Sequence, residues 1–152
     1  MEQAPRLSDQ VCFALYTASR AVINRYRPRL DELGVTYPQY LALLVLWERG
    51  DTTVKELGGA LQLDSSTLSP LLKRLEAAGL VRRERRADDE RSVLVRLTER
   101  GSQLRDRTHD IPAEIGCASG LTGQELADLR ATLQRVTASM TGEASDADLV
   151  HR

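Results

Sequence analysis

The sequence lacks any long apolar segment, which limits where the chain can work. Nowhere does it approach the roughly 20 consecutive apolar residues that a membrane span needs, and its first ten residues, MEQAPRLSDQ, contain no apolar signal core. Hydrophobic residues make up 41% and charged residues 28% of the 152 residues, as in ordinary soluble proteins. We therefore expect a cytoplasmic, single-domain protein with no membrane partner.

Cysteine is also scarce, and the patterns typical of enzymes are missing. Cys12 and Cys117 are too few and too far apart for a disulfide scaffold, and no Cys/His cluster has the spacing of zinc ligands. Gly-rich phosphate loops, paired catalytic carboxylates and Ser/His/Asp arrangements do not occur. We expect no enzymatic activity, no metal and no cofactor. In a reducing compartment the two thiols are either inert core residues or redox-active.

Capping residues and hydrophobic periodicity predict a mainly helical chain with one small hairpin. Ser8 is the expected N-cap of the first helix, and strand-like alternation on both sides of the polar tip RADDER predicts the hairpin. A third helix lies within LDSSTLSPLLKRLEAAGLV and stops at Gly79. The expected helices are 8–33, 36–47, 53–61, 63–79, about 98–115 and 122–140, and the expected strands are 80–85 and 92–97.

Basic residues are concentrated in one part of this nearly neutral chain. Between Ser65 and Arg86 six basic residues face two acidic ones, which gives a local charge of about +4 where the whole chain has −1. A charge run alone is often a solvated surface, but helix, turn, helix and an arginine-flanked hairpin in this order favour binding in a DNA groove. The candidate DNA-binding residues are Ser65, Ser66, Thr67, Ser69, Lys73, Arg74 and Arg86.

Two segments resemble a known family. DSSTLSPLLKRLEAAGLVRRERRADDERSVLVRLTERG is similar to the recognition helix and wing of MarR-type regulators, and QVCFALYTASRAVINRYRPRLDELGVTYPQYLALLVLWE resembles the branch of that family that senses organic hydroperoxides. The resemblance implies a winged helix-turn-helix fold. It places a helical dimerisation frame at about 8–35 and 98–140, a DNA-binding lobe at about 36–97 and a frayed tail at 141–152.

The resemblance also implies a mechanism and assigns residues to it. It implies a homodimeric repressor of a pseudo-palindromic double-stranded DNA operator, whose sensing thiol, Cys12, is oxidised by organic hydroperoxide, after which DNA is released. Cys117 falls where two-cysteine members have their resolving thiol. Asp89 and Arg91 match a wing pair in which the acid orients the arginine for the minor groove. Three tyrosines match phenols near the sensing thiol: Tyr16, Tyr26 and Tyr37.

Helix geometry adds a constraint on the thiol site. Tyr26 follows Cys12 by 14 residues in one predicted helix, which is about 21 Å along its axis. Neither side chain can bridge that distance, so a contact between them requires a second subunit packed antiparallel. Cys117 is expected in the flexible connection IGCASG, from which it would reach Cys12 across the dimer.

Other functions stay open at this stage. From the residues alone, a cysteine on an apolar stripe is usually a small hydrophobe, and tyrosines on a helix seam usually pack. The leading rival is a MarR-type repressor that responds to a small phenolic or apolar ligand and has structural cysteines. A thiol peroxidase would share the first oxidation step but lacks its expected scaffold, and a winged helix can also bind protein.

Overall fold

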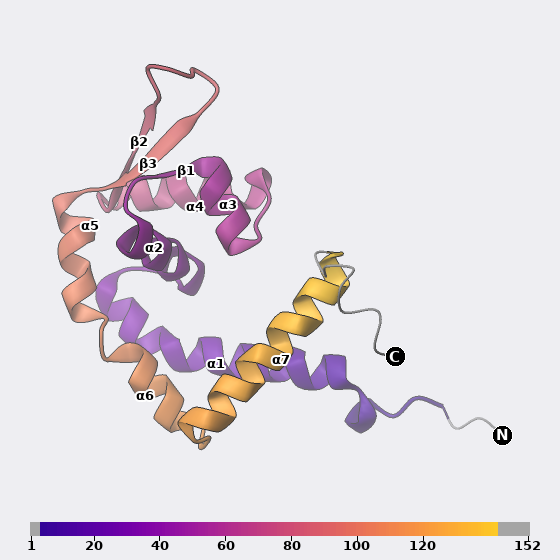
Figure 1. Ribbon diagram of the computed structural model, residues 1–152. Helices are drawn as coiled ribbons and strands as arrows, with labels where there is room; N and C mark the ends of the chain where they lie inside the picture. The colour runs from indigo at the N-terminus through magenta and orange to yellow at the C-terminus, as the bar shows by residue number, and fades with distance from the viewer. Residues whose placement is uncertain (1–3, 143–152) are drawn as a thin grey trace. The chain divides into compact units, whose positions relative to one another are not determined.

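The computed structural model describes residues 4–142, and the chain divides into two compact units, Met1–Ile111 and Pro112–Arg152. No helix in the described part is long and apolar enough to cross a membrane. The elements, shown in Figure 1, are η1 (Leu7–Asp9), α1 (Val11–Leu33), α2 (Tyr37–Arg49), β1 (Thr52–Thr53), α3 (Val54–Leu61), α4 (Ser65–Ala77), β2 (Val81–Arg85), β3 (Val93–Leu97), α5 (Glu99–Leu104), η2 (Arg105–Arg107), α6 (Ile111–Ala118) and α7 (Gly123–Thr141).

Most predicted helix starts are confirmed, and the first one is wrong. Thr36, Thr53 and Thr122 each form a complete capping box with the residue three positions later. Ser8 does not cap α1, because its hydroxyl donates to the neighbouring Asp9 carboxylate and lies in the short η1 turn. Helix α1 begins at Val11 without a side-chain cap.

The single helix predicted from Thr98 to about residue 115 is also wrong. Helix α5 ends at Leu104, a tight turn follows, and α6 begins at Ile111. Pro112 explains the break, because a proline has no N–H to donate to the Thr108 carbonyl and its ring would collide with that carbonyl in a continuous helix. The carbonyl of Thr108 instead accepts the N–H of Ile111 at 3.1 Å.

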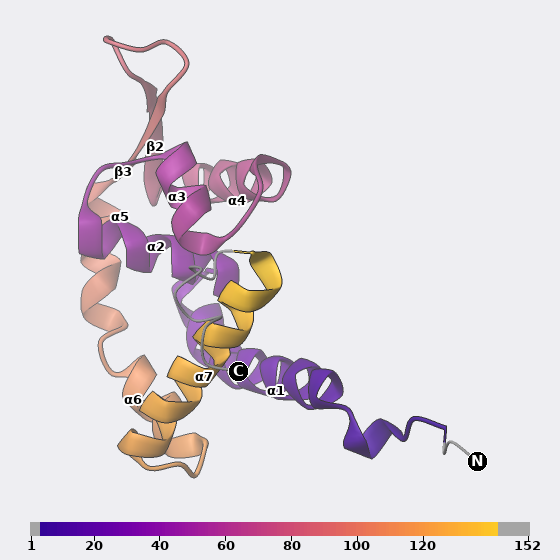
Figure 2. The ribbon, with the colours of Figure 1, turned by 45° about the vertical axis from the view of Figure 1, so that its right-hand side comes forward.

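The predicted hairpin is confirmed and forms part of a three-stranded antiparallel sheet with the order β1-β3-β2. Val81 pairs with Leu97 at the base of the hairpin and Arg85 with Val93 at its outer end. The two-residue strand β1, which the sequence did not reveal, pairs with β3 on the other side. The hairpin extends beyond helices α3 and α4 in both views (Figures 1 and 2).

The core of the first unit holds helix α4, the predicted recognition helix, in place. Helix α4 buries four leucines, Leu68, Leu71, Leu72 and Leu75. They belong to a core with leucines of α2 and α3 and with Val81 and Val95 of the hairpin. The buried face of α4 fixes its rotation, so its opposite face is the exposed one.

The second unit contains most of α6 and all of α7. A turn with Gly120 in the left-handed conformation (φ 73°) joins the two helices. No residue of α7 is buried, and Leu129, Val136 and Met140 remain exposed in the single chain. Within the predicted tail, residues 143–152 lie outside the described residues.

Candidate DNA interface and thiol site

The N-terminal turn of the recognition helix α4 is capped by Asp64, which the sequence analysis did not single out. The carboxylate of Asp64 accepts the Thr67 main-chain N–H at 2.8 Å and the Ser66 hydroxyl at 2.7 Å. These hydrogen bonds lower the pKa of Asp64, and the one from the Ser66 hydroxyl has the largest effect. The Ser66 hydroxyl and the Thr67 amide therefore have partners within the protein, whereas Ser65 and Ser69 are exposed. An aspartate directly before a run of small residues was the available signal.

A carboxylate also joins the recognition helix to the wing. Glu76 of α4 accepts the main-chain N–H of Arg83 in β2 at 2.9 Å and its guanidinium at 3.1 Å. The two Arg83 contacts lower the pKa of Glu76. Lys73 and Arg74 lie exposed on the same helix. The two elements predicted to read DNA are therefore held in a fixed relation, with basic side chains facing solvent.

The wing tip presents its arginines in two different ways. The guanidinium of Arg86 donates to both carboxylate oxygens of Asp88, at 3.0 and 2.8 Å. Asp89 accepts the main-chain N–H of Arg91 at 3.0 Å. The expected wing pair thus meets through the main chain of Arg91, and the contact between an acid and a guanidinium is made by Asp88 and Arg86.

A second charged cluster lies at the base of the wing. The Nε atom of Arg96, on the central strand β3, is 3.1 Å from the Asp51 carboxylate and 3.6 Å from that of Glu84. This Nε atom is buried and meets Asp51 as an ion pair without hydrogen-bond geometry. Because Asp51 directly precedes β1 and Glu84 belongs to β2, Arg96 links all three strands.

Two of the three predicted tyrosines lie together. The rings of Tyr26 in α1 and Tyr37 at the start of α2 are 4.9 Å apart, and Tyr40 joins them at 6.0 Å from Tyr26. Burial, followed by the neighbouring phenols of Tyr37 and Tyr40, raises the pKa of Tyr26 to about 12. The cluster therefore holds neutral phenols at physiological pH. Tyr40 was not predicted, although its spacing from Tyr37 places it one helical turn away.

Cys12 lies at the opposite end of the same helix. It is exposed and occupies the second position of α1, where main-chain amides have no partner within the helix. Tyr16 follows one turn later, and the Arg20 guanidinium lies 5.4 Å from the centre of its ring. Because α1 is continuous from Val11 to Leu33, Cys12 and Tyr26 of one chain are about 21 Å apart along its axis.

The expected position of Cys117 in a flexible connection is wrong. Cys117 is exposed but belongs to the last turn of α6, which continues to Ala118. The small residues around Cys117 suggest a loop, but Ser119 and Gly120 form the turn. Cys117 is therefore presented by a helix end.

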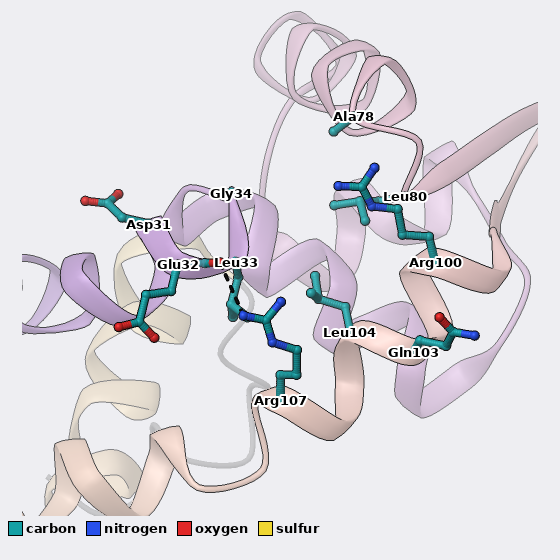
Figure 3. Close-up of a pocket in the computed structure, with 10 residues that line it drawn as sticks. All are labelled: Asp31, Glu32, Leu33, Gly34, Ala78, Leu80, Arg100, Gln103, Leu104 and Arg107. Carbon is teal, nitrogen blue, oxygen red and sulfur yellow. Dashed lines mark hydrogen bonds between the residues drawn. The ribbon is translucent and has the colours of Figure 1, made fainter.

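Two cavities of the first unit are relevant to a ligand-binding rival. The larger, about 380 Å³, lies beside the C-terminal turns of α1 and α4 and the α5 segment, and the smaller is about 250 Å³ and includes Tyr37. Four charged side chains line the larger one, Asp31, Glu32, Arg100 and Arg107 (Figure 3). In Figure 3 Arg107 donates to the Glu32 carbonyl, at 3.4 Å. The charged lining of the larger cavity does not suit an apolar ligand, whereas the smaller cavity is lined mainly by apolar and aromatic residues, among them Ile23, Leu30 and Tyr37.

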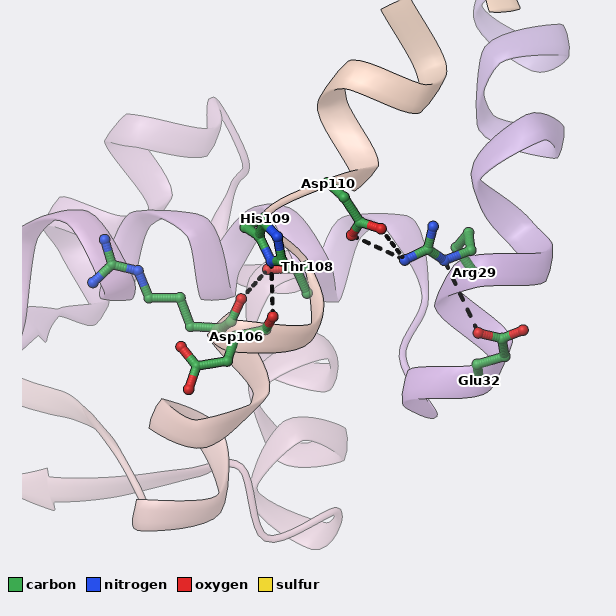
Figure 4. A network of polar contacts seen from close by, with 7 residues as sticks. Arg29, Glu32, Asp106, Thr108, His109 and Asp110 are labelled. Atoms are coloured by element: carbon green, nitrogen blue, oxygen red, sulfur yellow. Dashed lines mark hydrogen bonds and ion pairs between the residues drawn. The ribbon is translucent and has the colours of Figure 1, made fainter.

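A polar network fastens the C-terminal part of α1 to the turn before α6 (Figure 4). Nη2 of Arg29 donates to both oxygens of Asp110 at 3.0 Å, and this contact lowers the pKa of Asp110. Arg29 also lies 4.0 Å from Glu32, and His109 contacts the Asp106 carbonyl at 2.9 Å. The network fixes the end of the first unit to the helix that carries Cys12.

Known proteins are similar to this chain in sequence and fold. A family model described as "Transcriptional regulator SarA/Rot" matches residues 23–108. The organic hydroperoxide resistance transcriptional regulator of Bacillus subtilis (strain 168) is 50% identical over 128 residues, covering 84% of this chain and 87% of that protein.

Solved structures of AbfR, a protein of Staphylococcus epidermidis, are also similar. Reduced AbfR bound to DNA has a TM-score of 0.72 at 37% identity and covers 90% of this chain and 95% of its own. The disulfide-formed AbfR has a TM-score of 0.61 at 39% identity and covers 87% and 93%. The chain therefore belongs to the MarR-type winged helix-turn-helix transcriptional regulators, in the branch of the organic hydroperoxide resistance regulators.

Proposed function

We propose that the chain is a homodimeric DNA-binding repressor that senses organic hydroperoxide through Cys12, forms a disulfide with Cys117 and then releases its operator. The observation that carries the proposal is the layout of α1, which presents an exposed thiol at its N-terminus and a neutral phenol cluster near its other end. The names of the relatives support it, since one is an organic hydroperoxide resistance regulator and another was solved both bound to DNA and in a disulfide form.

The DNA-binding part of the proposal rests on charge and shape. Lys73 and Arg74 on α4 and Arg91 on the wing tip are exposed on the first unit. A recognition helix in a major groove and a wing in the adjacent minor groove would use these side chains for phosphates and base edges. If the interface is electrostatic, the logarithm of the affinity falls linearly with the logarithm of the salt concentration.

The dimer part of the proposal rests on the length of α1. Cys12 and Tyr26 cannot meet within one chain, so an antiparallel pair of α1 helices would place the thiol of one subunit beside Tyr26 and Tyr37 of the other. The exposed apolar residues of α1 and α7 supply surface for such a pairing, among them Val11, Leu15, Val22, Leu129 and Val136. Sensing and dimerisation would then share one surface.

The redox chemistry proceeds in two balanced steps. The Cys12 thiolate attacks the peroxide oxygen, the O–O bond breaks, and Cys12 sulfenic acid and an alcohol form after proton uptake. In the dimer, tyrosine hydroxyls would donate hydrogen bonds to the Cys12 sulfur. The Cys117 thiol then displaces water from the sulfenic acid, which gives a disulfide and requires Cα atoms within about 7 Å.

The cysteine variants test this chemistry. Non-reducing gels of the wild-type protein after treatment with cumene hydroperoxide should show a covalent dimer that dithiothreitol reverses. Cys12→Ser should abolish it and keep DNA binding during oxidation, whereas Cys117→Ser should still form sulfenic acid at Cys12. If Cys12→Ser still releases DNA on peroxide treatment, the proposed sensor is wrong. An oxidised monomer with an internal disulfide would contradict the bond between subunits.

A further inference from the structure

We propose that Asp88 positions Arg86 for DNA, so that Asp88 and Arg86 form an acid–arginine unit of this wing in addition to the pair implied by the resemblance. The inference rests on the proposed DNA-binding function and adds a residue that the sequence analysis did not single out. Asp88 acts through Arg86 and is therefore a positioning residue, whereas Arg86 is the residue that would touch DNA.

Arg86 is held at its main chain as well as at its side chain. Its N–H donates to the Ser92 carbonyl at 3.0 Å, which continues the β2–β3 ladder one step beyond the Arg85–Val93 pair. Its Nε and Nη2 atoms donate to the two oxygens of Asp88 at 3.0 and 2.8 Å. The Arg86 side chain is nevertheless 44% exposed, so the held guanidinium still reaches solvent.

The geometry leaves Arg86 the donors that DNA recognition needs. A guanidinium has five N–H donors in one plane. Asp88 takes one from Nε and one from Nη2. Of the remaining three, one on Nη1 and one on Nη2 point outward in parallel along the Nη1/Nη2 edge. Two parallel donors on this edge match the paired acceptors of a guanine, or a phosphate. A side chain fixed before binding loses less conformational entropy on contact.

Asp89 makes a different contact, although it follows Asp88 directly. Its side chain accepts the Arg91 main-chain N–H, and its carbonyl accepts the Ser92 N–H at 3.0 Å. Asp89 therefore shapes the turn of the tip. Among residues 4–142 no hydrogen bond or ion pair to the Arg91 guanidinium or to the Glu90 carboxylate occurs. Of three consecutive acids, Asp88 is the one that holds a guanidinium.

A matched pair of variants separates positioning from charge. Asp88→Asn and Glu90→Gln each remove one negative charge from the wing tip and nearly preserve side-chain size. Charge alone predicts equal or tighter binding for both, because DNA is an anion. We expect Asp88→Asn to weaken binding about 2- to 12-fold, the range for an arginine that must be ordered on binding, and Glu90→Gln to bind as tightly as wild type or more so. Fluorescence anisotropy with an operator duplex selected from a random pool measures both at fixed salt.

A double-mutant cycle with Arg86→Ala distinguishes positioning from a damaged wing. In the Arg86→Ala background Asp88→Asn should no longer weaken binding, because no guanidinium remains to be held. An equal loss in both backgrounds, or equal binding by Asp88→Asn and Glu90→Gln, would overturn the inference while leaving the proposed function intact. A wild-type protein that bound no duplex DNA would overturn the proposed function and the inference together.

Discussion

Gly101 in α5 is the position where the packing predicts the sharpest response to one added methyl group. Its N–H donates to the Thr98 hydroxyl at 3.1 Å, and its carbonyl accepts the Trp47 indole N–H at 2.9 Å. A Cβ at Gly101 would lie far inside van der Waals contact with the Leu80 carbonyl oxygen and 3.2 Å from Leu97 Cδ2. The Leu80 carbonyl oxygen also accepts the Thr98 N–H at 3.0 Å, so a shift of this oxygen would weaken that hydrogen bond.

Two opposing effects set the magnitude for Gly101→Ala. Alanine in place of glycine inside a helix gains about 0.5–1 kcal/mol from backbone entropy, whereas overpacking against the main chain costs about 1–3 kcal/mol. We therefore expect the free energy of unfolding to fall by about 1–2 kcal/mol, which lowers Tm by several degrees, at about 2–4 °C per kcal/mol.

Urea unfolding followed by circular dichroism and by Trp47 fluorescence, at one protein concentration, measures the change at Gly101. Gly59 in α3 is the matched control, because an added Cβ there meets nothing within 4 Å. Gly59→Ala should gain about 0.5–1 kcal/mol. A Gly101→Ala variant as stable as wild type would contradict the close packing of α5 against the Leu80 carbonyl.

Three further predictions concern single side chains. Because its folded pKa of about 12 exceeds the usual 10.0, the stability that Tyr26 contributes is present below pH 10 and is lost as pH rises toward 12, so Tyr26→Phe should flatten that decline in Tm. Because Arg29 lowers the pKa of Asp110, Asp110→Asn should reduce the urea midpoint at pH 7, and the difference from wild type should shrink as pH falls below the usual 3.8; a difference that persisted there would contradict the ion pair. Leu72 is 1% exposed, so Leu72→Ala should lower the free energy of unfolding, measured by urea unfolding, by about 2–5 kcal/mol; a decrease of less than about 1 kcal/mol would contradict its place in the core.

Features of the fold that depend on local sequence could be predicted. Thr36 and Thr53 cap the predicted helices because a capping box needs residues only three positions apart. The break before α6 was also within reach of the sequence, since Pro112 cannot continue a helix. Cys117 shows the limit of composition, because small residues that suggest a loop also form the end of a helix.

Features that depend on three-dimensional contact could not be predicted from the sequence. Strand β1 has two residues and exists only because β3 lies beside it. The choice of Asp88 as the partner of Arg86 depends on how the hairpin tip turns, and three consecutive acids offered no basis for selecting one. The family resemblance implies Tyr26 and Tyr37, whereas Tyr40 belongs to the cluster because α1 and α2 pack against each other.

The central claim, that oxidation of a thiol controls DNA binding, is tested most directly by one reversible titration. The affinity of the wild-type dimer for its selected operator duplex is measured by fluorescence anisotropy in the reduced state, after one equivalent of cumene hydroperoxide per subunit, and again after dithiothreitol. The account predicts tight binding, loss of binding and full recovery, with no loss for Cys12→Ser. Unchanged affinity of the wild-type protein after oxidation would contradict it.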